Sequence, residues 1–145
     1  MLLTHGAGVN SQDYEGTTPL EEAIQQQNLA LLPTLFDRSP NLELRDAGGN
    51  TALLWAAACG QLTSVSALLA HGANPNARDN FGTSALAEVS LIEEDNRIQI
   101  TRMLVEHFAD AENVDASGQS ALFNADIPVA RFLIARGANI TNRGD

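Results

Sequence analysis

The apolar residues of this chain recur at the spacing of short helices that each bury one face. Leu20, Ala23 and Ile24 stand at positions i, i+3 and i+4, and the stretch "LLWAA" from Leu53 repeats the pattern, so each group forms one stripe on a helix. A second kind of stripe follows, comprising Leu62, Val65, Leu68 and Leu69. Helices this short are marginally stable alone. We therefore expect them to be held by packing against neighbouring units.

Polar residues mark where these helices begin and end. Residues able to cap a helix N-terminus precede the first stripe of each unit; they are Thr18, Thr51, Ser84 and Ser120. Pro19 suits a first turn, and Gly60 can end the helix that begins after Thr51. These signals predict a helix pair in each unit.

The same pattern repeats along the whole chain. An Asp and, three residues later, a Gly recur at spacings of 33, 33 and 36; the pairs are Asp13 and Gly16, Asp46 and Gly49, Asp79 and Gly82, and Asp115 and Gly118. A period of this length indicates a repeat architecture. We predict one repeat domain over residues 1–145, with a partial repeat at 1–12, full repeats at 13–45, 46–78 and 79–114, and a short repeat with the start of the next hairpin at 115–145.

Three places depart from the period. Pro33 falls inside a predicted second helix, where we expect a late start or a kink. The third unit has three extra residues, best placed as a loop at 92–97, and the fourth has lost residues between its helices. We expect the first helix of the fourth unit to be barely a turn and a half, and the second to begin at Asp126 with Pro128 in its first turn.

The stretches "GTTPLEEAI", "GNTALLWAAACG" and "LLAHGANPNA" resemble ankyrin repeats over essentially all 145 residues. The resemblance implies an all-α solenoid of stacked helix-turn-helix units with projecting β-hairpin loops, which binds proteins on a concave face. The usual His after Thr-Pro-Leu is absent, and Glu21, Leu54, Ala87 and Phe123 stand there instead. The hydrogen bonds between repeats that this His would make are therefore in question.

Charge narrows the class of partner. Asp and Glu number 18 against 8 Lys and Arg, a net charge of −10, which disfavours nucleic acid and anionic lipid. The longest apolar run, Leu53 to Cys59, is too short to span a bilayer, so we expect no membrane partner. One cysteine and no signal-peptide pattern favour the cytoplasm.

Few residues of the sequence support metal binding or catalysis. His5, His71 and His107 fall in one column of the repeat with Arg38 and Arg136, at helix C-termini where a positive charge is favourable. Units about 10 Å apart are too far for two of these histidines to share one metal. We interpret Cys59 as a small packing residue and the terminal "RGD" as coincidence. We expect no catalytic residues, no metal site, no cofactor and no enzyme activity.

Candidate partner-binding residues follow from the family's plan. The hairpin tips are Tyr14 and Glu15, Ala47 and Gly48, Asn80 and Phe81, and Ala116 and Ser117. On the first helices, the residue two after the buried Leu lies about 200° around the axis and is expected to face outward; these residues are Glu22, Trp55, Glu88 and Asn124. Trp55 could instead serve packing. Glu93, Glu94 and Asp95 form either a solvated loop or a contact with a basic partner.

Two functions fit this pattern. One is a non-catalytic protein-binding module, an adaptor or recognition segment. The alternative is an acidic stand-alone inhibitor or immunity protein that neutralises a basic toxin or enzyme.

The opening "MLLTHGAGVN" matches the tail of a repeat, so Leu2 and Leu3 are expected to pack near Leu32 and Leu35. Either the chain was cut from a longer array or it begins on half a repeat, and exposed terminal repeats could self-associate.

Overall fold

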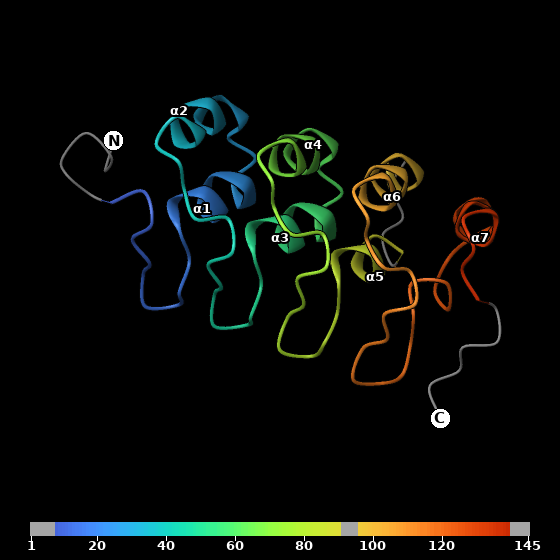
Figure 1. The fold of residues 1–145 in the computed structure, drawn as a ribbon. Coiled ribbons are helices and arrows are strands. Elements are labelled where there is room, and N and C mark those ends of the chain that lie inside the picture. The colour runs from blue at the N-terminus through green and yellow to red at the C-terminus, as the bar shows by residue number, and fades with distance from the viewer. Residues whose placement is uncertain (1–7, 91–95, 140–145) are drawn as a thin grey trace.

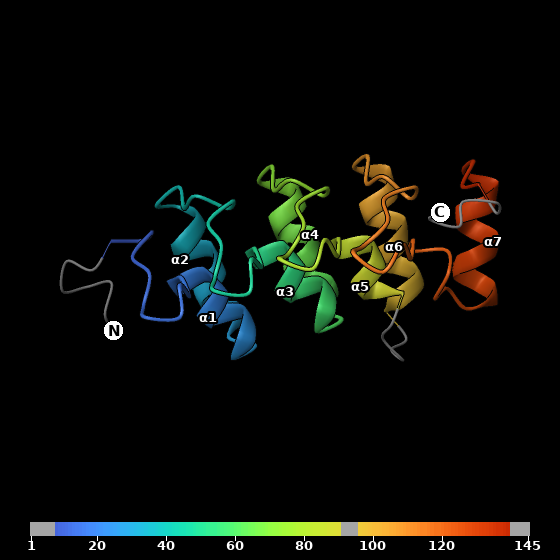
Figure 2. The same ribbon diagram turned by 90° about the horizontal axis from the view of Figure 1, so that it is seen from below.

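The helices form a single row of stacked pairs, with hairpin loops projecting from one side (Figure 1). The computed structural model describes residues 8–90 and 96–139. The α-helices are α1 (Pro19–Gln25), α2 (Leu32–Phe36), α3 (Ala52–Ala58), α4 (Leu62–Ala70), α5 (Ala85–Val89), α6 (Arg97–Glu106) and α7 (Ile127–Ala135), with one 3-10 turn, η2 (Leu29–Leu31). The first helices of the units make one layer and the second helices the other (Figures 1 and 2). The described residues therefore form the all-α repeat array that the sequence predicts.

Side-chain caps start the helices where the sequence places them. Thr18 accepts a hydrogen bond from the Glu21 amide, and Thr51 and Ser84 cap α3 and α5 in the same way. Asp126 caps α7 by accepting from the Val129 amide at 3.0 Å. Gly60 follows the end of α3 with a φ of 64°, a conformation that glycine adopts without steric cost.

The irregular units have simple causes. Proline tolerates a first turn but not a helix interior, so α2 starts only at Leu32, with Pro33 in its first turn, after the 3-10 turn. The expected late start is confirmed. The expected short first helix of the fourth unit is wrong: residues 121–124 form turns only, and Ser120 caps no helix. Five residues separate Ser120 from Asp126, as many as α5 contains, so a helix there would leave no residues for the turn that leads into α7.

A continuous apolar core runs along the array. One large residue from the centre of each helix layer is almost fully buried in every unit, as seen for Leu20, Leu35, Leu53, Leu68, Leu86, Leu104 and Leu133. Ala56 and Ala57 are fully buried at the centre of α3, which contacts α1 on one side and α5 on the other. Small side chains allow this close approach of helices, so each unit is covered by its neighbours.

Each hairpin is built around its aspartate. The Asp13 Oδ1 atom accepts hydrogen bonds from the amides of Glu15 and Thr17, both at 2.9 Å, and Asp79 and Asp115 bond in the same pattern. Aspartate side chains commonly close turns in this way. Among the described residues the hairpins contain isolated β-bridges, Arg78 with Ser84 and Val114 with Ser120, rather than longer strands.

Hydrogen bonds between units replace those of the missing histidines. At the hairpins, the amides of Ala47, Asn80 and Ala116 donate to the carbonyls of Glu15, Gly48 and Phe81 in the preceding unit. Past the second helices, a side chain of each unit accepts from the next backbone, as Glu43 does from Asn74 at 2.8 Å. Between the helices, Gln61 donates to the Ile24 carbonyl at 2.8 Å. Backbone and amide groups therefore hold the register of the stack.

Within residues 8–90 and 96–139, every helix is too short or too polar to cross a bilayer.

Candidate protein-binding surface

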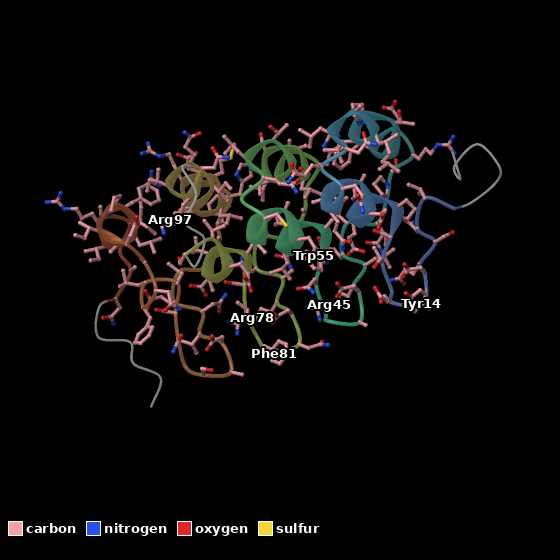
Figure 3. All side chains as sticks on the ribbon, turned by 180° about the vertical axis from the view of Figure 1, so that it is seen from behind. Tyr14, Arg45, Trp55, Arg78, Phe81 and Arg97 are labelled. Atoms are coloured by element: carbon pink, nitrogen blue, oxygen red, sulfur yellow. The ribbon has the colours of Figure 1, made fainter. Side chains whose placement is uncertain are left out.

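The hairpin tips stand in a row along one side of the array, and two of them carry exposed aromatics. We call the eight residues at these tips the tip row; they are Tyr14, Glu15, Ala47, Gly48, Asn80, Phe81, Ala116 and Ser117. Tyr14 is 94% exposed and Phe81 71% exposed, and Figure 3 shows both at the ends of their hairpins. Glu15 and Asn80 are also exposed. These four predicted residues therefore lie on one accessible surface.

The tip row is fixed by bonds that continue from unit to unit. The Ala47 amide donates to the Glu15 carbonyl at 2.7 Å and the Asn80 amide to the Gly48 carbonyl at 3.0 Å. Asn80 also donates from Nδ2 to the Ala47 carbonyl at 2.9 Å. Gly49 permits this approach, because a Cβ at that position would lie 2.7 Å from the Asn80 nitrogen. The aromatic tips are thus presented on a well-connected backbone.

The first-helix residues differ in how far they face outward. Glu22 is exposed and Glu88 is half-buried. Burial, together with the negative charge of Asp79, raises the pKa of the Glu88 carboxyl above its ordinary value. Asn124 donates to Gln119 at 3.3 Å from the turn that replaces the fourth first helix. Of the four predicted first-helix residues, Glu22 is the one that both lies on a helix and is exposed to solvent.

Trp55 lies closer to the protein than its helical angle predicts. It is half-buried and packs against the core, and its Nε1 donates to the Asp46 Oδ2 atom at 2.9 Å. The hairpin of the same unit lies against α3 at this point. A residue that the helical angle places away from the core is therefore still partly covered. Trp55 therefore has a structural role in joining α3 to that hairpin, which corrects the expectation of a freely outward-facing residue.

Asp46 illustrates how hydrogen bonds can outweigh burial. Burial alone would raise its pKa, but hydrogen bonds from Asn50, Trp55 and the Gly48 amide favour the carboxylate and leave the pKa below its ordinary value. The Asn50 amide donates at 2.8 Å. Asp46 therefore stays ionised while it organises its hairpin.

Glu21 is a buried carboxyl that sequence reasoning did not single out. Its side chain is 1% exposed and accepts from the Thr18 amide at 2.7 Å, completing a capping box. Within residues 8–90 and 96–139, its Oε1 atom has no hydrogen-bond partner. Burial raises the pKa of Glu21 to about 7, despite the hydrogen bonds from Thr18 and with help from the charges of Asp46 and Asp13. The Thr-x-x-Glu spacing signals the cap, but not the burial.

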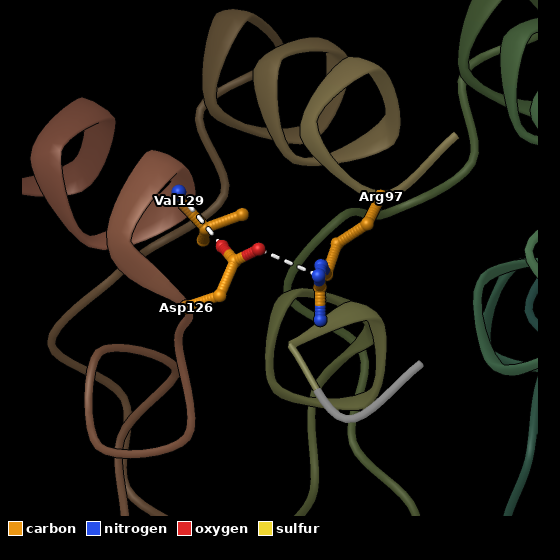
Figure 4. A network of polar contacts seen from close by, with 3 residues as sticks. All are labelled: Arg97, Asp126 and Val129. Atoms are coloured by element: carbon orange, nitrogen blue, oxygen red, sulfur yellow. Dashed lines mark hydrogen bonds and ion pairs between the residues drawn. The ribbon is translucent and has the colours of Figure 1, made fainter. Parts of the chain in front are cut away.

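Arginines near the hairpins bond to backbone carbonyls instead of forming ion pairs with these acids. Arg78 on a hairpin stem donates to the Val114 carbonyl at 3.0 Å, and Arg45 donates to the Arg78 carbonyl (Figure 3). The ion pair found among the described residues lies elsewhere, between Arg97 Nη2 and Asp126 Oδ2 at 2.5 Å (Figure 4). Among the described residues, the carboxylates of Glu15 and Glu22 on the side of the tip row therefore form no ion pair.

The histidine column has a structural use. The Nδ1 atoms of His71 and His107 each lie 2.8 Å from the carbonyl oxygen four residues earlier, those of Ala67 and Met103. The two histidines stand at the C-terminal caps of α4 and α6, as expected. In the part of the chain that the structure describes, three or more possible metal ligands never gather in one place.

Cys59 and several predicted residues near the chain ends and in the long loop need separate mention. Cys59 is exposed, so its interpretation as a packing residue is wrong; as the C-cap residue of α3 it lies beyond the buried stripe. Glu93, Glu94 and Asp95 lie outside the described residues, as do His5, the expected packing of Leu2 and Leu3, and the terminal "RGD".

Comparison with known proteins identifies the family. Residues 1–79 match the family described as ankyrin repeats (3 copies). B-cell lymphoma 3 protein homolog of Mus musculus is 32% identical over 148 residues, which cover 96% of this chain and 32% of that protein. Palmitoyltransferase AKR1 of Lachancea kluyveri is 32% identical over 144 residues, 97% of this chain and 18% of that protein.

A third relative, neurogenic locus notch homolog protein 1 of Xenopus laevis, is 30% identical over 125 residues, 86% of this chain and 5% of that protein. The chain thus spans about a third or less of the length of these relatives. Their agreement over most of this chain, the match to the family and the stacked helix pairs lead to one conclusion: the chain belongs to the ankyrin-repeat family.

Proposed function

We propose that this chain binds a protein partner across the tip row and the adjoining first helices, as a recognition surface with no chemistry of its own. Ankyrin repeats generally mediate protein–protein interactions. The observation that carries the proposal for this chain is the pair of exposed aromatic tips, Tyr14 and Phe81. Large aromatics are over-represented among the residues that contribute most to interface affinity.

The setting of these aromatics favours binding. Their backbones are already fixed by the aspartate-centred turns and by hydrogen bonds between units, so little conformational entropy is lost when a partner docks. The small residues Ala47 and Gly48 stand between them in the row. The two rings are therefore two separate anchors, about 20 Å apart along the row, for an extended partner surface.

Substitution at the tips tests the proposal. Proteins captured from the native host on immobilised wild-type chain would be compared with those captured on the double variant Tyr14→Ser and Phe81→Ser. We expect the specific partner to be lost while the thermal unfolding midpoint stays the same, because neither ring is buried. Phe123→Ser is the matched control, since Phe123 is 67% exposed but lies off the tip row. Equal capture by the double variant would contradict the proposal.

A second candidate is capture of a basic protein by an acidic inhibitor. It is supported by the carboxylates near the tip row, which form no ion pair with an arginine among the described residues, and by the net charge of −10. Electrostatic steering would make the association rate fall sharply between low and high salt. An association rate that hardly changes with salt would instead favour recognition through the aromatic tips.

Cellular placement and assembly are proposed on the same basis. The composition supports a location in the cytoplasm, which fractionation of host cells would test; recovery from the medium would argue against it.

Self-association through the terminal units is supported by the exposure of Ile127 and Ile134, 75% and 47%, on α7. Sedimentation at increasing concentration would test it.

A further inference from the structure

Phe108 holds a backbone conformation that favours glycine and that only a small residue otherwise adopts at this place in the repeat. Its φ is 67°, and the equivalent positions after α2, α4 and α7 hold Ser39, Gly72 and Gly137 with φ of 50°, 88° and 98°. A residue with a Cβ is disfavoured in this left-handed region. The Phe108 residue is 86% exposed, so it gains little from packing within its own chain. Strain kept without an internal benefit points to a function.

Two arginines are ordered on an aromatic ring in the neighbouring unit. The guanidinium carbons of Arg102, on α6, and Arg136, after α7, lie 5.4 and 5.1 Å from the centroid of the Phe132 ring. Both arginines are exposed. Stacking on a ring restrains a guanidinium while leaving its donors free to bind an anion in the plane of the group.

Positive charge gathers at these two helices in an otherwise acidic chain. Four of the seven arginines in the described residues belong to α6, α7 and the residue after it; they are Arg97, Arg102, Arg131 and Arg136. Arg97 pairs with Asp126. Among the described residues the other three make no ion pair, although Glu106 stands one helical turn from Arg102. Their charge is therefore available to an external carboxylate.

These groups lie on one edge of the array. The loops that follow α2, α4 and α6 run along the same edge, and α7 ends at that edge (Figure 2). Arg136 occupies the position in its unit that His107 occupies in the preceding one, and neighbouring units are about 10 Å apart. Phe108, directly after His107, is thus within the reach of a peptide segment that also contacts Arg136.

We propose that Arg102, Phe108, Phe132 and Arg136 form a second docking surface, which binds an acidic segment of a partner protein that carries an apolar side chain. Carboxylates of the segment accept charge-assisted hydrogen bonds from the two guanidinium groups. Its apolar side chain packs on Phe108. The tip row and its adjoining first helix carry Glu15 and Glu22, whereas this edge carries Arg102 and Arg136, so the two surfaces favour segments of opposite charge and can be occupied together.

The test uses a fluorescein-labelled peptide of glutamates around one central leucine, with a lysine counterpart, and fluorescence anisotropy of the full chain. We expect the acidic peptide to bind and the double variant Arg102→Gln and Arg136→Gln to weaken it by about tenfold or more. Arg38→Gln is the matched control. Arg38 is exposed and holds the equivalent place after α2, so its loss should leave binding unchanged.

Phe108→Gly separates binding from stability. Glycine relieves the left-handed backbone, so we expect a higher thermal unfolding midpoint together with weaker binding of the acidic peptide. The proposal is overturned if the wild-type chain does not bind the acidic peptide, if Arg38→Gln weakens binding as much as the double variant, or if Phe108→Gly leaves binding unchanged. It is equally overturned if sedimentation shows a dimer that the arginine double variant abolishes, because the occupant would then be a second copy.

Discussion

At the scale of single residues, Glu21 shows how a position in a repeat can change its chemistry. The family pattern places a histidine here, and a glutamate in the first turn of a helix reads as an ordinary favourable charge. In the structure the side chain is buried on α1, a helix that packs against α3 of the next unit, and among the described residues one of its oxygens has no hydrogen-bond partner. Burial depends on that neighbour, so the sequence of the unit alone could not reveal it.

The raised pKa of Glu21 predicts a stability that falls as pH rises. The carboxyl keeps its proton in the folded chain up to about pH 7, whereas its ordinary pKa is 4.5. Between these values the unfolded chain has lost the proton and the folded chain has not, so folding becomes less favourable as pH increases. The whole effect is on the order of 1–3 kcal/mol and is complete above pH 7.

Glu21→Gln should remove this dependence. Glutamine can still complete the capping box but carries no charge, so we expect the variant to be more stable than the wild type at pH 8 and equal to it near pH 4. Urea unfolding at both pH values measures the difference. Glu22→Gln, in the same turn but exposed, should change the free energy of unfolding by less than about 0.5 kcal/mol. A destabilised Glu21→Gln variant at pH 8 would show that the carboxylate is favourable after all.

Trp55 marks the limit of reasoning from helical angles. The angle predicts an outward side chain, but Trp55 packs against the core and its Nε1 bonds to Asp46 in the hairpin of its own unit. The exposed tips Tyr14 and Phe81 were easier to predict, because a turn closed by its own aspartate leaves the tip residues nothing to pack against. The sequence predicts hydrogen bonds within a turn, such as those to its aspartate. It does not predict contacts between separate segments, such as that of Trp55 with its hairpin.

At the scale of elements, capping residues and prolines predicted where the helices begin. Glycine is needed in the loops for two reasons that can be separated by experiment. Gly49 and Gly72 both have a left-handed backbone, with φ of 81° and 88°. A Cβ at Gly49 would also meet Asn80 of the next hairpin at 2.4–2.8 Å, whereas a Cβ at Gly72 would meet nothing within 4 Å. The pair therefore distinguishes conformational strain from steric overlap.

Gly72→Ala should cost about 1 kcal/mol from backbone strain alone. Gly49→Ala should cost that amount and a further 1–3 kcal/mol or so, because the Asn80 hairpin must shift. Chemical denaturation of the two variants gives the comparison. Equal losses would mean that the Asn80 side chain moves aside freely and that the contact between hairpins does not stabilise the stack.

At the scale of the whole molecule, each unit depends on its neighbours, and the last described unit has the fewest contacts. It lacks a first helix, because the chain between Ser120 and Asp126 leaves no room for both a helix and the turn into α7, and the main contact of α7 with an earlier helix is with α6. The period in the sequence predicted that this unit is shortened. It did not predict the loss of the helix, which depends on the room that the turn into α7 needs.

The attachment of α7 should therefore control local opening at this end of the array. Asp126 both caps α7 and pairs with Arg97 (Figure 4). Asp126→Asn keeps a good cap and removes only the ion pair, so α7 amides should exchange hydrogen roughly two- to threefold faster, in line with a partly exposed pair worth about 0.5 kcal/mol. Asp126→Ala removes both and should speed exchange by about tenfold or more, since a lost cap costs roughly a further 1 kcal/mol. Amides of α3 and α4 should be unaffected, because opening of α7 leaves the central units covered. If α3 and α4 exchanged faster by the same factor, the array would open as one cooperative unit rather than from its end.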